Sequence, residues 1–285
     1  MPKLPSMEEM LKAGVHFGHQ AAHWHPKMET YIYTTRNGVH IIDLKKTHTK
    51  LEAALAYLSK VVADGGDVLF VGTKIQAKPL IEQYAKVCKM PYVCSRWVGG
   101  TLTNFNAIKI SIQRYVELLR GKESGDWEKY TKKERSELQK EVDRLHEMFA
   151  GLVNMRSIPK AMFVVDIRTE QTAVKEAHVM KVPVVAVCDT NTNPTGITCV
   201  IPANDDATRG VELMIKAAAE ACEEGLKNRK VVAAPVKKEA TPAFRPAAVR
   251  KPAPAKEAAP AVTVKAEAPK AAAKKAPRVK KEKAE

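Results

Sequence analysis

Three short, uninterrupted apolar runs constrain the fold of this chain more than any other feature. They lie within residues 67–72, 161–166 and 183–189, each of which has an aspartate at one end, and the first two lead into segments with helical periodicity. An apolar run without alternation is typical of a strand buried on both faces, as in a parallel sheet covered by helices. The sequence therefore predicts an α/β fold, completed by short strands at 91–94 and 198–201 and a last helix from Asp205 to about Leu226.

The first 66 residues are expected to lead into this sheet. Residues 1–30 contain a short amphipathic segment followed by glycines and a proline, so we interpret them as a loop-rich N-terminal arm. Asn37-Gly38 between two apolar stretches predicts a β-hairpin with Arg36 at its exposed tip. A helix with Leu51 to Val62 on its apolar face follows, and we interpret the strand at 39–43, this helix and the run at 67–72 as one β-α-β unit.

The periodicity changes at Phe105 and stays helical to about residue 155. Apolar residues recur at alternating steps of three and four, with charged residues between them, as in coiled coils. Gly121 and Gly125 interrupt the pattern, and Thr131 with Glu134 forms a capping box that restarts it. We expect an antiparallel coiled-coil hairpin at 105–155, inserted into an α/β domain of residues 1–104 and 156–230. This hairpin is either a solvated spacer or an arm that holds a partner.

Charge is concentrated in the C-terminal segment. The whole chain has a net charge of +15, of which residues 231–285, with 14 Lys or Arg against 5 Asp or Glu, contribute +9. This Ala/Pro/Lys-rich segment lacks the apolar residues of a core, so we expect a disordered basic tail that adds salt-sensitive affinity for RNA. Five cysteines without a Cys-x-x-Cys pair, no signal peptide and no apolar run of membrane-spanning length predict a cytoplasmic protein with no membrane partner.

Enzymatic chemistry has weak support in the motifs. Asp166, Asp189 and Asp205 with Lys74 would form a nucleotide or phosphotransfer site at the edge of the sheet. Gly72-Thr73-Lys74 at the start of a helix could hold a phosphate, but the chain has no Gly-x-x-x-x-Gly-Lys-Ser/Thr and no Gly-x-Gly-x-x-Gly. A flavodoxin-like nucleotide- or phosphate-binding enzyme is therefore the alternative, and a binding protein without catalysis is the favoured interpretation.

The stretch at 93–105 is the strongest candidate for contact with a partner. It combines Arg96, which suits phosphate, with the indole of Trp97 and with Gly99-Gly100, whose backbone can approach a partner closely. The alternative is a tight loop in which Trp97 packs against the protein. We favour Trp97 as a packing anchor and Arg96 as the contact.

Five motifs resemble the bacterial-type small-subunit ribosomal protein S-two family. They occur in order over about residues 5–226: Leu11-Lys-Ala-Gly-Val-His-Phe-Gly-His19, Phe70-Val-Gly-Thr-Lys74, Arg96-Trp-Val-Gly-Gly-Thr-Leu-Thr-Asn104, Pro159-Lys-Ala-Met-Phe-Val-Val-Asp166 and Ile201-Pro-Ala-Asn-Asp-Asp206. The resemblance implies a flavodoxin-like parallel sheet with the helical hairpin inserted, and a structural role on the small ribosomal subunit.

The resemblance also implies partners and site residues. The expected partners are ribosomal RNA and neighbouring ribosomal proteins, including ribosomal protein S-one, whose docking brings messenger RNA to the subunit; no small-molecule substrate is expected. Candidate RNA contacts are Arg36, Lys74, Arg96, Trp97, Asn104 and Lys109. No cofactor is required, but relatives hold a metal ion near the sheet edge. The matching residues are His19, Asp189 and Asp205, which suit zinc better than magnesium.

Overall fold

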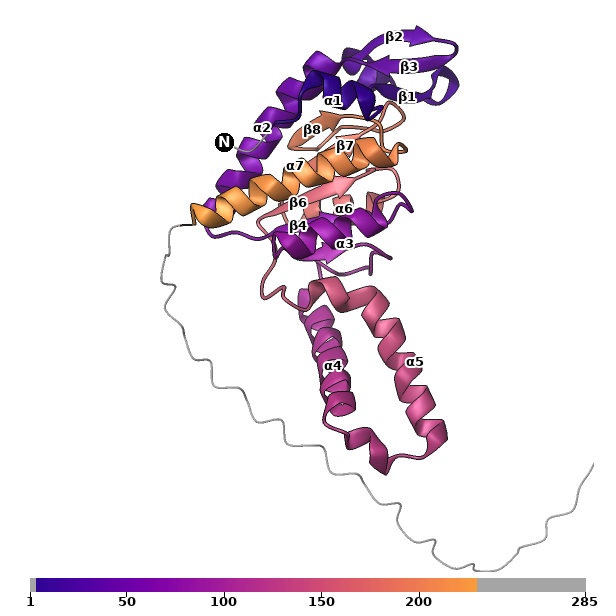
Figure 1. Cartoon of the computed structure of the whole chain (residues 1–285), viewed down its shortest axis with the longest axis vertical. Coiled ribbons are helices and arrows are strands. Elements are labelled where there is room, and N and C mark those ends of the chain that lie inside the picture. The colour runs from indigo at the N-terminus through magenta and orange to yellow at the C-terminus, as the bar shows by residue number, and fades with distance from the viewer. Residues whose placement is uncertain (1–3, 230–285) are drawn as a thin grey trace, which may run out of the picture. The chain divides into compact units, whose positions relative to one another are not determined.

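A sheet of five parallel strands forms the centre of the protein (Figure 1). The structure is a computed structural model that describes residues 4–229. The strands are β4 (Val68–Val71), β5 (Tyr92–Val93), β6 (Ala161–Val165), β7 (Val184–Cys188) and β8 (Cys199–Pro202). Their spatial order is β5-β4-β6-β7-β8, which is the order of flavodoxin-like folds. The predicted α/β class and parallel sheet are confirmed.

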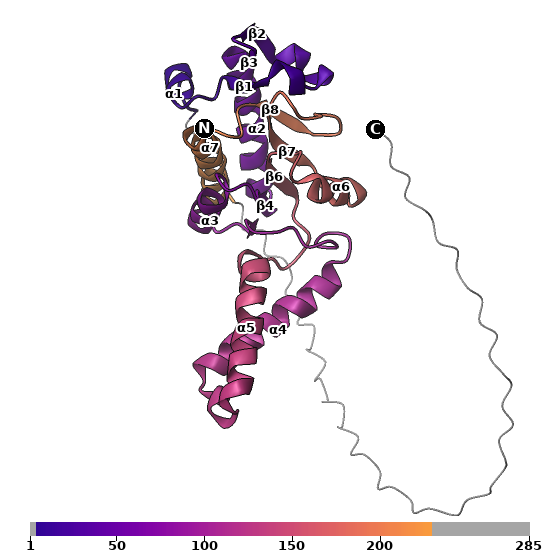
Figure 2. The same cartoon turned by 90° about the vertical axis from the view of Figure 1, so that its right-hand side faces the viewer.

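Helices cover both faces of this sheet (Figures 1 and 2). One face carries α2 (Leu44–Ala63), α3 (Lys78–Val87) and α7 (Thr208–Lys227). The other carries α6 (Gln171–Val179) and the inner ends of the helical pair α4 (Phe105–Glu123) and α5 (Lys132–Phe149). The last helix, α7, begins at Thr208, which is later than the predicted start at Asp205.

Alternate residues of each strand enter two separate cores. In β4, Val68 and Phe70 pack with α2, α3 and α7, whereas Leu69 and Val71 pack with α6 and the helical pair. Phe70 lies opposite Phe163 of β6, with ring centroids 5.3 Å apart. Because both faces are covered, every residue of β4, β6 and β7 is buried, which explains the unbroken apolar runs.

A second, three-stranded antiparallel sheet contains β1 (Phe17–Gln20), β2 (Ile32–Arg36) and β3 (Val39–Ile42). The predicted hairpin around Asn37-Gly38 is confirmed, and both turn residues have positive φ. Two other expectations are wrong. The loop-rich arm contains a strand, β1, besides α1 (Met7–Lys12) and the short 3₁₀ helices at Ala21–His23 and Pro26–Tyr31. The strand β3 belongs to this sheet and not to that of β4, so they do not form a β-α-β unit.

The helices α4 and α5 pack against each other in antiparallel orientation. Tyr115 bonds His146 near the inner end of the pair and Lys122 bonds Gln139 farther out, so residue numbers rise on one helix as they fall on the other. The buried seam contains Ile108, Ile112, Tyr115 and Leu118 on α4 and Val142, Leu145 and Phe149 on α5. The predicted capping box of Thr131 and Glu134 is present. Coiled-coil geometry stays a prediction.

Short connections complete the described chain. The 3₁₀ helices Asp126–Lys129 and Ala150–Leu152 lie at the two ends of α5, and the latter contacts β5. None of the helices described for residues 4–229 is long and apolar enough to cross a membrane. The predicted basic tail at 231–285 lies outside the described residues.

Candidate nucleic-acid interface and acidic cluster

One buried carboxylate, that of Glu176 on α6, holds the loop between β5 and α4. Its Oε1 accepts hydrogen bonds from the indole N–H of Trp97 (3.0 Å) and the amide of Gly100 (2.8 Å). Its Oε2 accepts from the amides of Leu102 (3.0 Å) and Thr103 (3.2 Å) and from the Thr103 hydroxyl (3.2 Å). The loop is thereby fixed to α6 immediately before α4 begins.

The same bonds keep Glu176 ionised. Burial favours the neutral carboxyl, but the hydrogen bonds from Trp97, Leu102, Gly100 and Thr103 outweigh burial, so the pKa of Glu176 lies below its ordinary value. No motif in the sequence singles out Glu176. A glutamate at an inward position of an amphipathic helix, between Ala173 and Ala177, was the available signal, because a charge at such a position requires partners.

The anchored loop gives its two large side chains different environments. Trp97 is half-buried and bonded to Glu176, which favours the packing interpretation of its indole. Arg96 is exposed. Asn104 is exposed at the N-cap of α4 and its side chain makes no capping hydrogen bond, and Lys109 is exposed one turn into the helix. Four of the predicted contact residues therefore lie along one segment, at the base of α4.

Arg36 lies elsewhere. It is the last residue of β2 and is exposed. The strand β2 and the helix α4 lie at opposite ends of the described residues in both views (Figures 1 and 2). Arg36 and Arg96 therefore cannot form one local site.

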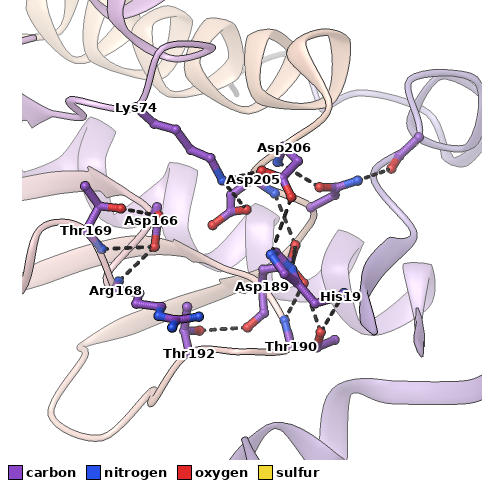
Figure 3. Close-up of polar contacts among 12 residues, drawn as sticks. His19, Lys74, Asp166, Arg168, Thr169, Asp189, Thr190, Thr192, Asp205 and Asp206 are labelled. Atoms are coloured by element: carbon purple, nitrogen blue, oxygen red, sulfur yellow. Dashed lines mark hydrogen bonds and ion pairs between the residues drawn. The ribbon is translucent and has the colours of Figure 1, made fainter. Parts of the chain in front are cut away.

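Lys74 lies in an acidic cluster at the carboxyl edge of the sheet (Figure 3). Its ammonium is 2.8 Å from Oδ1 of Asp205 and 2.6 Å from Oδ1 of Asp206. Burial disfavours the charged amine, but these two carboxylates more than offset it and raise the pKa of Lys74. A contact of Lys74 with RNA phosphate stays a prediction; here its charge is shared by two carboxylates.

His19 closes the other side of the cluster. Its Nδ1 is 3.0 Å from Oδ2 of Asp189, and its Nε2 is 3.4 Å from Oδ2 of Asp206 (Figure 3). The amide of His19 is bonded to the Thr190 hydroxyl, and Gly18 leaves room for this approach, since a Cβ on it would lie 2.6 Å from the Thr190 side chain. The hydrogen bond to Asp189 raises the pKa of His19.

The structure brings together a group of possible metal ligands that differs in one member from the predicted trio of His19, Asp189 and Asp205, because it contains Asp206 and not Asp189. Ligand atoms of His19, Asp205 and Asp206 lie within 4.8 Å of one another, which makes Asp206 a candidate ligand that the sequence analysis did not name. Burial, followed by the charge of Asp189, raises the pKa of Asp205 to about 6. An imidazole with carboxylates suits zinc. The donor set therefore fits a divalent cation, although the Lys74 ammonium already contacts two of the carboxylates.

In the turn after β4, the backbone amide of Thr73 already has an acceptor and is not available to a phosphate. The amide of Thr73 donates to Oε1 of Glu170 at 2.8 Å. Asp166, the neighbouring candidate for catalysis, accepts from the amides of Arg168 and Thr169 and from the Thr169 hydroxyl, so it stabilises its own turn. Both carboxylates have structural partners at the point where a flavodoxin-like sheet would receive a nucleotide.

Fold and site together define an α/β protein with a flavodoxin-like sheet, a pair of antiparallel helices between β5 and β6, and a loop at their base that exposes Arg96. Comparison with known proteins gives the family. The model of the family described as Ribosomal protein S2 matches residues 10–225. The chain belongs to this family, whose members are structural proteins of the ribosome and not enzymes, which excludes the enzyme alternative.

Three similar proteins carry the name of the same ribosomal protein. The chain is 49% identical over 220 residues to "Small ribosomal subunit protein uS2" of Chlorobaculum tepidum, covering 77% of this chain and 88% of the relative. It is 48% identical over 214 residues to the protein of the same name from Chlorobaculum parvum, covering 75% and 85%. The protein of that name from Fusobacterium nucleatum is 49% identical over 221 residues, covering 77% and 90%. The resemblance found in the motifs is confirmed.

Proposed function

We propose that this chain is a structural component of the small ribosomal subunit in the cytoplasm and binds ribosomal RNA with the surface at the base of α4. The observation that carries this proposal is the loop held by Glu176. Five hydrogen bonds to one carboxylate, three of them from backbone amides, fix the loop, while Arg96 remains exposed and without a bonded partner among the described residues. A fixed backbone with a free guanidinium suits phosphate recognition, because little order must be gained on binding.

Asn104 and Lys109 extend this surface along α4. Asn104 offers a side-chain amide that makes no capping hydrogen bond, and Lys109 offers a second cation; both lie on the same segment as Arg96. We propose that Trp97 acts through the loop, as an anchor, and that residues 105–155 form an inserted arm that contacts RNA or neighbouring ribosomal proteins. Arg36 would contact RNA separately, at the hairpin of β2 and β3.

Replacing Arg96 and Lys109 together by Ala is expected to weaken attachment to the small subunit. Because each cation removed eliminates a phosphate contact, the variant should have a shallower salt dependence, so its deficit relative to wild type should be largest at low salt and shrink as salt concentration rises across a gradient series. Sucrose-gradient sedimentation of cell extract, with immunoblotting of the fractions, measures the share of the chain that travels with small subunits.

The matched control is Arg209→Ala with Lys216→Ala, which removes the same charges from exposed positions on α7. Equal attachment of the two double variants would contradict the assigned surface. A wild-type chain found wholly in the free fraction would overturn the ribosomal role itself. Probing the same fractions for ribosomal protein S-one tests the further proposal, drawn from the family resemblance, that the chain supports docking of S-one and messenger RNA.

We also propose that the acidic cluster binds zinc through His19, Asp205 and Asp206. Asp189 would orient the imidazole through Nδ1, leaving Nε2 toward Asp206. Support comes from the donor chemistry and from the spacing of the ligand atoms.

Asp206→Asn is expected to abolish most zinc binding without unfolding the chain, since the Asp206 side chain is 55% exposed. Elemental analysis after dialysis against zinc, followed by zinc-free buffer, measures bound metal. Asp64→Asn, an exposed aspartate at the end of α2, should retain wild-type zinc. Equal zinc in all three proteins would exclude the site.

A further inference from the structure

A basic groove lies between α2, the turn before β2 and the segment before β8. It consists of two adjoining hollows, of about 570 Å³ and about 440 Å³, which share Thr30, Tyr31 and Lys50 as lining residues. Lys45 and Lys46 line the first hollow, and Lys27 lines the second. None of these residues belongs to the surface at the base of α4.

The charge of this groove is nearly of one sign. Four lysines line it, and Asp43 is the one acidic residue among its described lining residues. The carboxylate of Asp43 already has partners within the protein. Its Oδ1 accepts a hydrogen bond from the backbone amide of Lys45 at 3.0 Å, and its Oδ2 lies 3.7 Å from the ammonium of Lys46. By contrast, the hollow beside α3 and α5 is lined by Lys78 together with Glu82 and Glu147. The basic groove therefore has an uncompensated positive charge, which the other hollow lacks.

The lysines differ in how they are held. The ammonium of Lys27 donates to the Thr195 hydroxyl at 2.6 Å, and that of Lys46 donates to the carbonyl of Thr30. Lys45 and Lys50 are exposed, and neither ammonium has a hydrogen-bonded or ion-pair partner among the described residues. Two cations are thus positioned by the protein and two are free to follow a ligand.

An aromatic ring completes the groove. Tyr31 is half-buried and lines both hollows, and its carbonyl is bonded to the amide of Asp43, which fixes its backbone. Cations that follow a backbone together with an aromatic face for a base are the combination that binds unpaired nucleic acid. An acidic protein segment would use the lysines but would not require the ring.

From these observations we propose that the basic groove is a second RNA-binding surface, in which the lysines contact phosphates and Tyr31 stacks on an unpaired base. This inference rests on the proposed role in the small subunit and adds a contact at a different place on the chain.

The test uses the full chain and small subunits from cells depleted of it. Purified wild-type chain and a triple variant, Lys27→Gln with Lys45→Gln and Lys50→Gln, are titrated onto these subunits at several KCl concentrations and constant magnesium. The control triple variant, Lys12→Gln with Lys60→Gln and Lys216→Gln, removes three exposed lysines outside the groove. Equal melting temperatures of the three proteins establish that all are folded.

The groove variant is expected to bind more weakly than the control at low salt, with a salt dependence whose slope is smaller by about 2, since each lost contact to single-stranded phosphate removes about 0.7. Its disadvantage should therefore shrink about 20-fold between about 50 and about 200 mM KCl. Ultraviolet crosslinking of bound wild-type chain should place a nucleotide on the peptide containing Tyr31.

Three outcomes would count against the proposal, and they are distinguishable. Binding and salt slope equal to the control, with Arg96→Ala and Lys109→Ala still weakening attachment, would overturn the groove and leave the proposed function standing. Weaker binding with Tyr31 crosslinked to a protein would replace RNA by an acidic protein partner. Failure of the wild-type chain to bind the depleted subunits would instead overturn the proposed function.

Discussion

Replacing Glu176 by Gln is expected to lower the free energy of unfolding at neutral pH by about 3 kcal/mol, because the amide has one accepting oxygen where the carboxylate has two. Each carboxylate oxygen serves at least two donors: Trp97 and Gly100 on one side, Leu102 and Thr103 on the other. The NH₂ group of Gln would face one of these sets and leave its donors unpaired. Thermal or urea denaturation measures the change.

The substitution should also loosen the loop between β5 and α4 locally. Hydrogen exchange is expected to accelerate in the variant at the amide of Gly100 or at those of Leu102 and Thr103, whichever set faces the NH₂ group of Gln and loses its acceptor. Glu52→Gln, at an exposed position of α2, is the matched control and should change neither stability nor exchange. Slow exchange of the loop in Glu176→Gln would show that the carboxylate does not hold it.

The same substitution predicts a pH dependence. The pKa of Glu176 is lowered in the folded protein from its ordinary value of 4.5, so its contribution to stability is complete above that value and is lost as pH falls through the folded pKa. The stability difference between wild type and Glu176→Gln should therefore be constant near neutral pH and become smaller below about pH 4.5. A difference that grows on acidification would contradict this assignment.

Replacing Lys74 by Met is the second substitution with a large expected effect, a loss of about 3 kcal/mol, because it removes the ammonium from buried acidic groups. The side chain of Asp205 is only 1% exposed and contacts Lys74 at 2.8 Å, and the amide of Asp205 is bonded to Asp189. Without Lys74 the carboxylates repel one another, and of the ion pairs among residues 4–229 that involve them, those of His19 with Asp189 and Asp206 remain. The melting temperature of the purified chain measures this loss.

Two further variants separate charge from packing. Lys78→Met removes a lysine whose ion pair with Glu147, at 3.9 Å, is largely exposed, so it should cost less than about 1 kcal/mol. Adding Asp205→Asn to Lys74→Met should restore part of the stability by removing the uncompensated charge. If the double variant were less stable than Lys74→Met alone, electrostatic repulsion would not be the cause.

The sheet was predictable because burial on both faces leaves a direct mark on the sequence. The strands β4, β6 and β7 had to be apolar at every position, since neither of their faces reaches water. The hairpin at Asn37-Gly38 was predictable for a similar reason, since the turn needs positive φ at both residues. The strand β1 left no such mark, because it is short, contains glycine and is half exposed.

Whether a candidate RNA-binding residue is free or paired left no mark on the sequence. The sequence singled out Arg96 and Trp97 by residue type, but residue type does not distinguish a free cation from a neutralised one. Lys74 and Arg96 have similar chemistry, and only the folded chain brings Asp205 and Asp206 within 3 Å of Lys74 while leaving Arg96 exposed.

By itself, the sequence determined the α/β class, the helical insertion and, through its motifs, the family. The tertiary structure alone decided that Trp97 bonds Glu176, that Lys74 is paired with Asp205 and Asp206, and that the lysines of the basic groove lie together. The physical reason is distance along the chain. Periodicity and turn chemistry act between near neighbours, whereas Glu176 meets Trp97 across 79 positions and Lys74 meets Asp205 across 131.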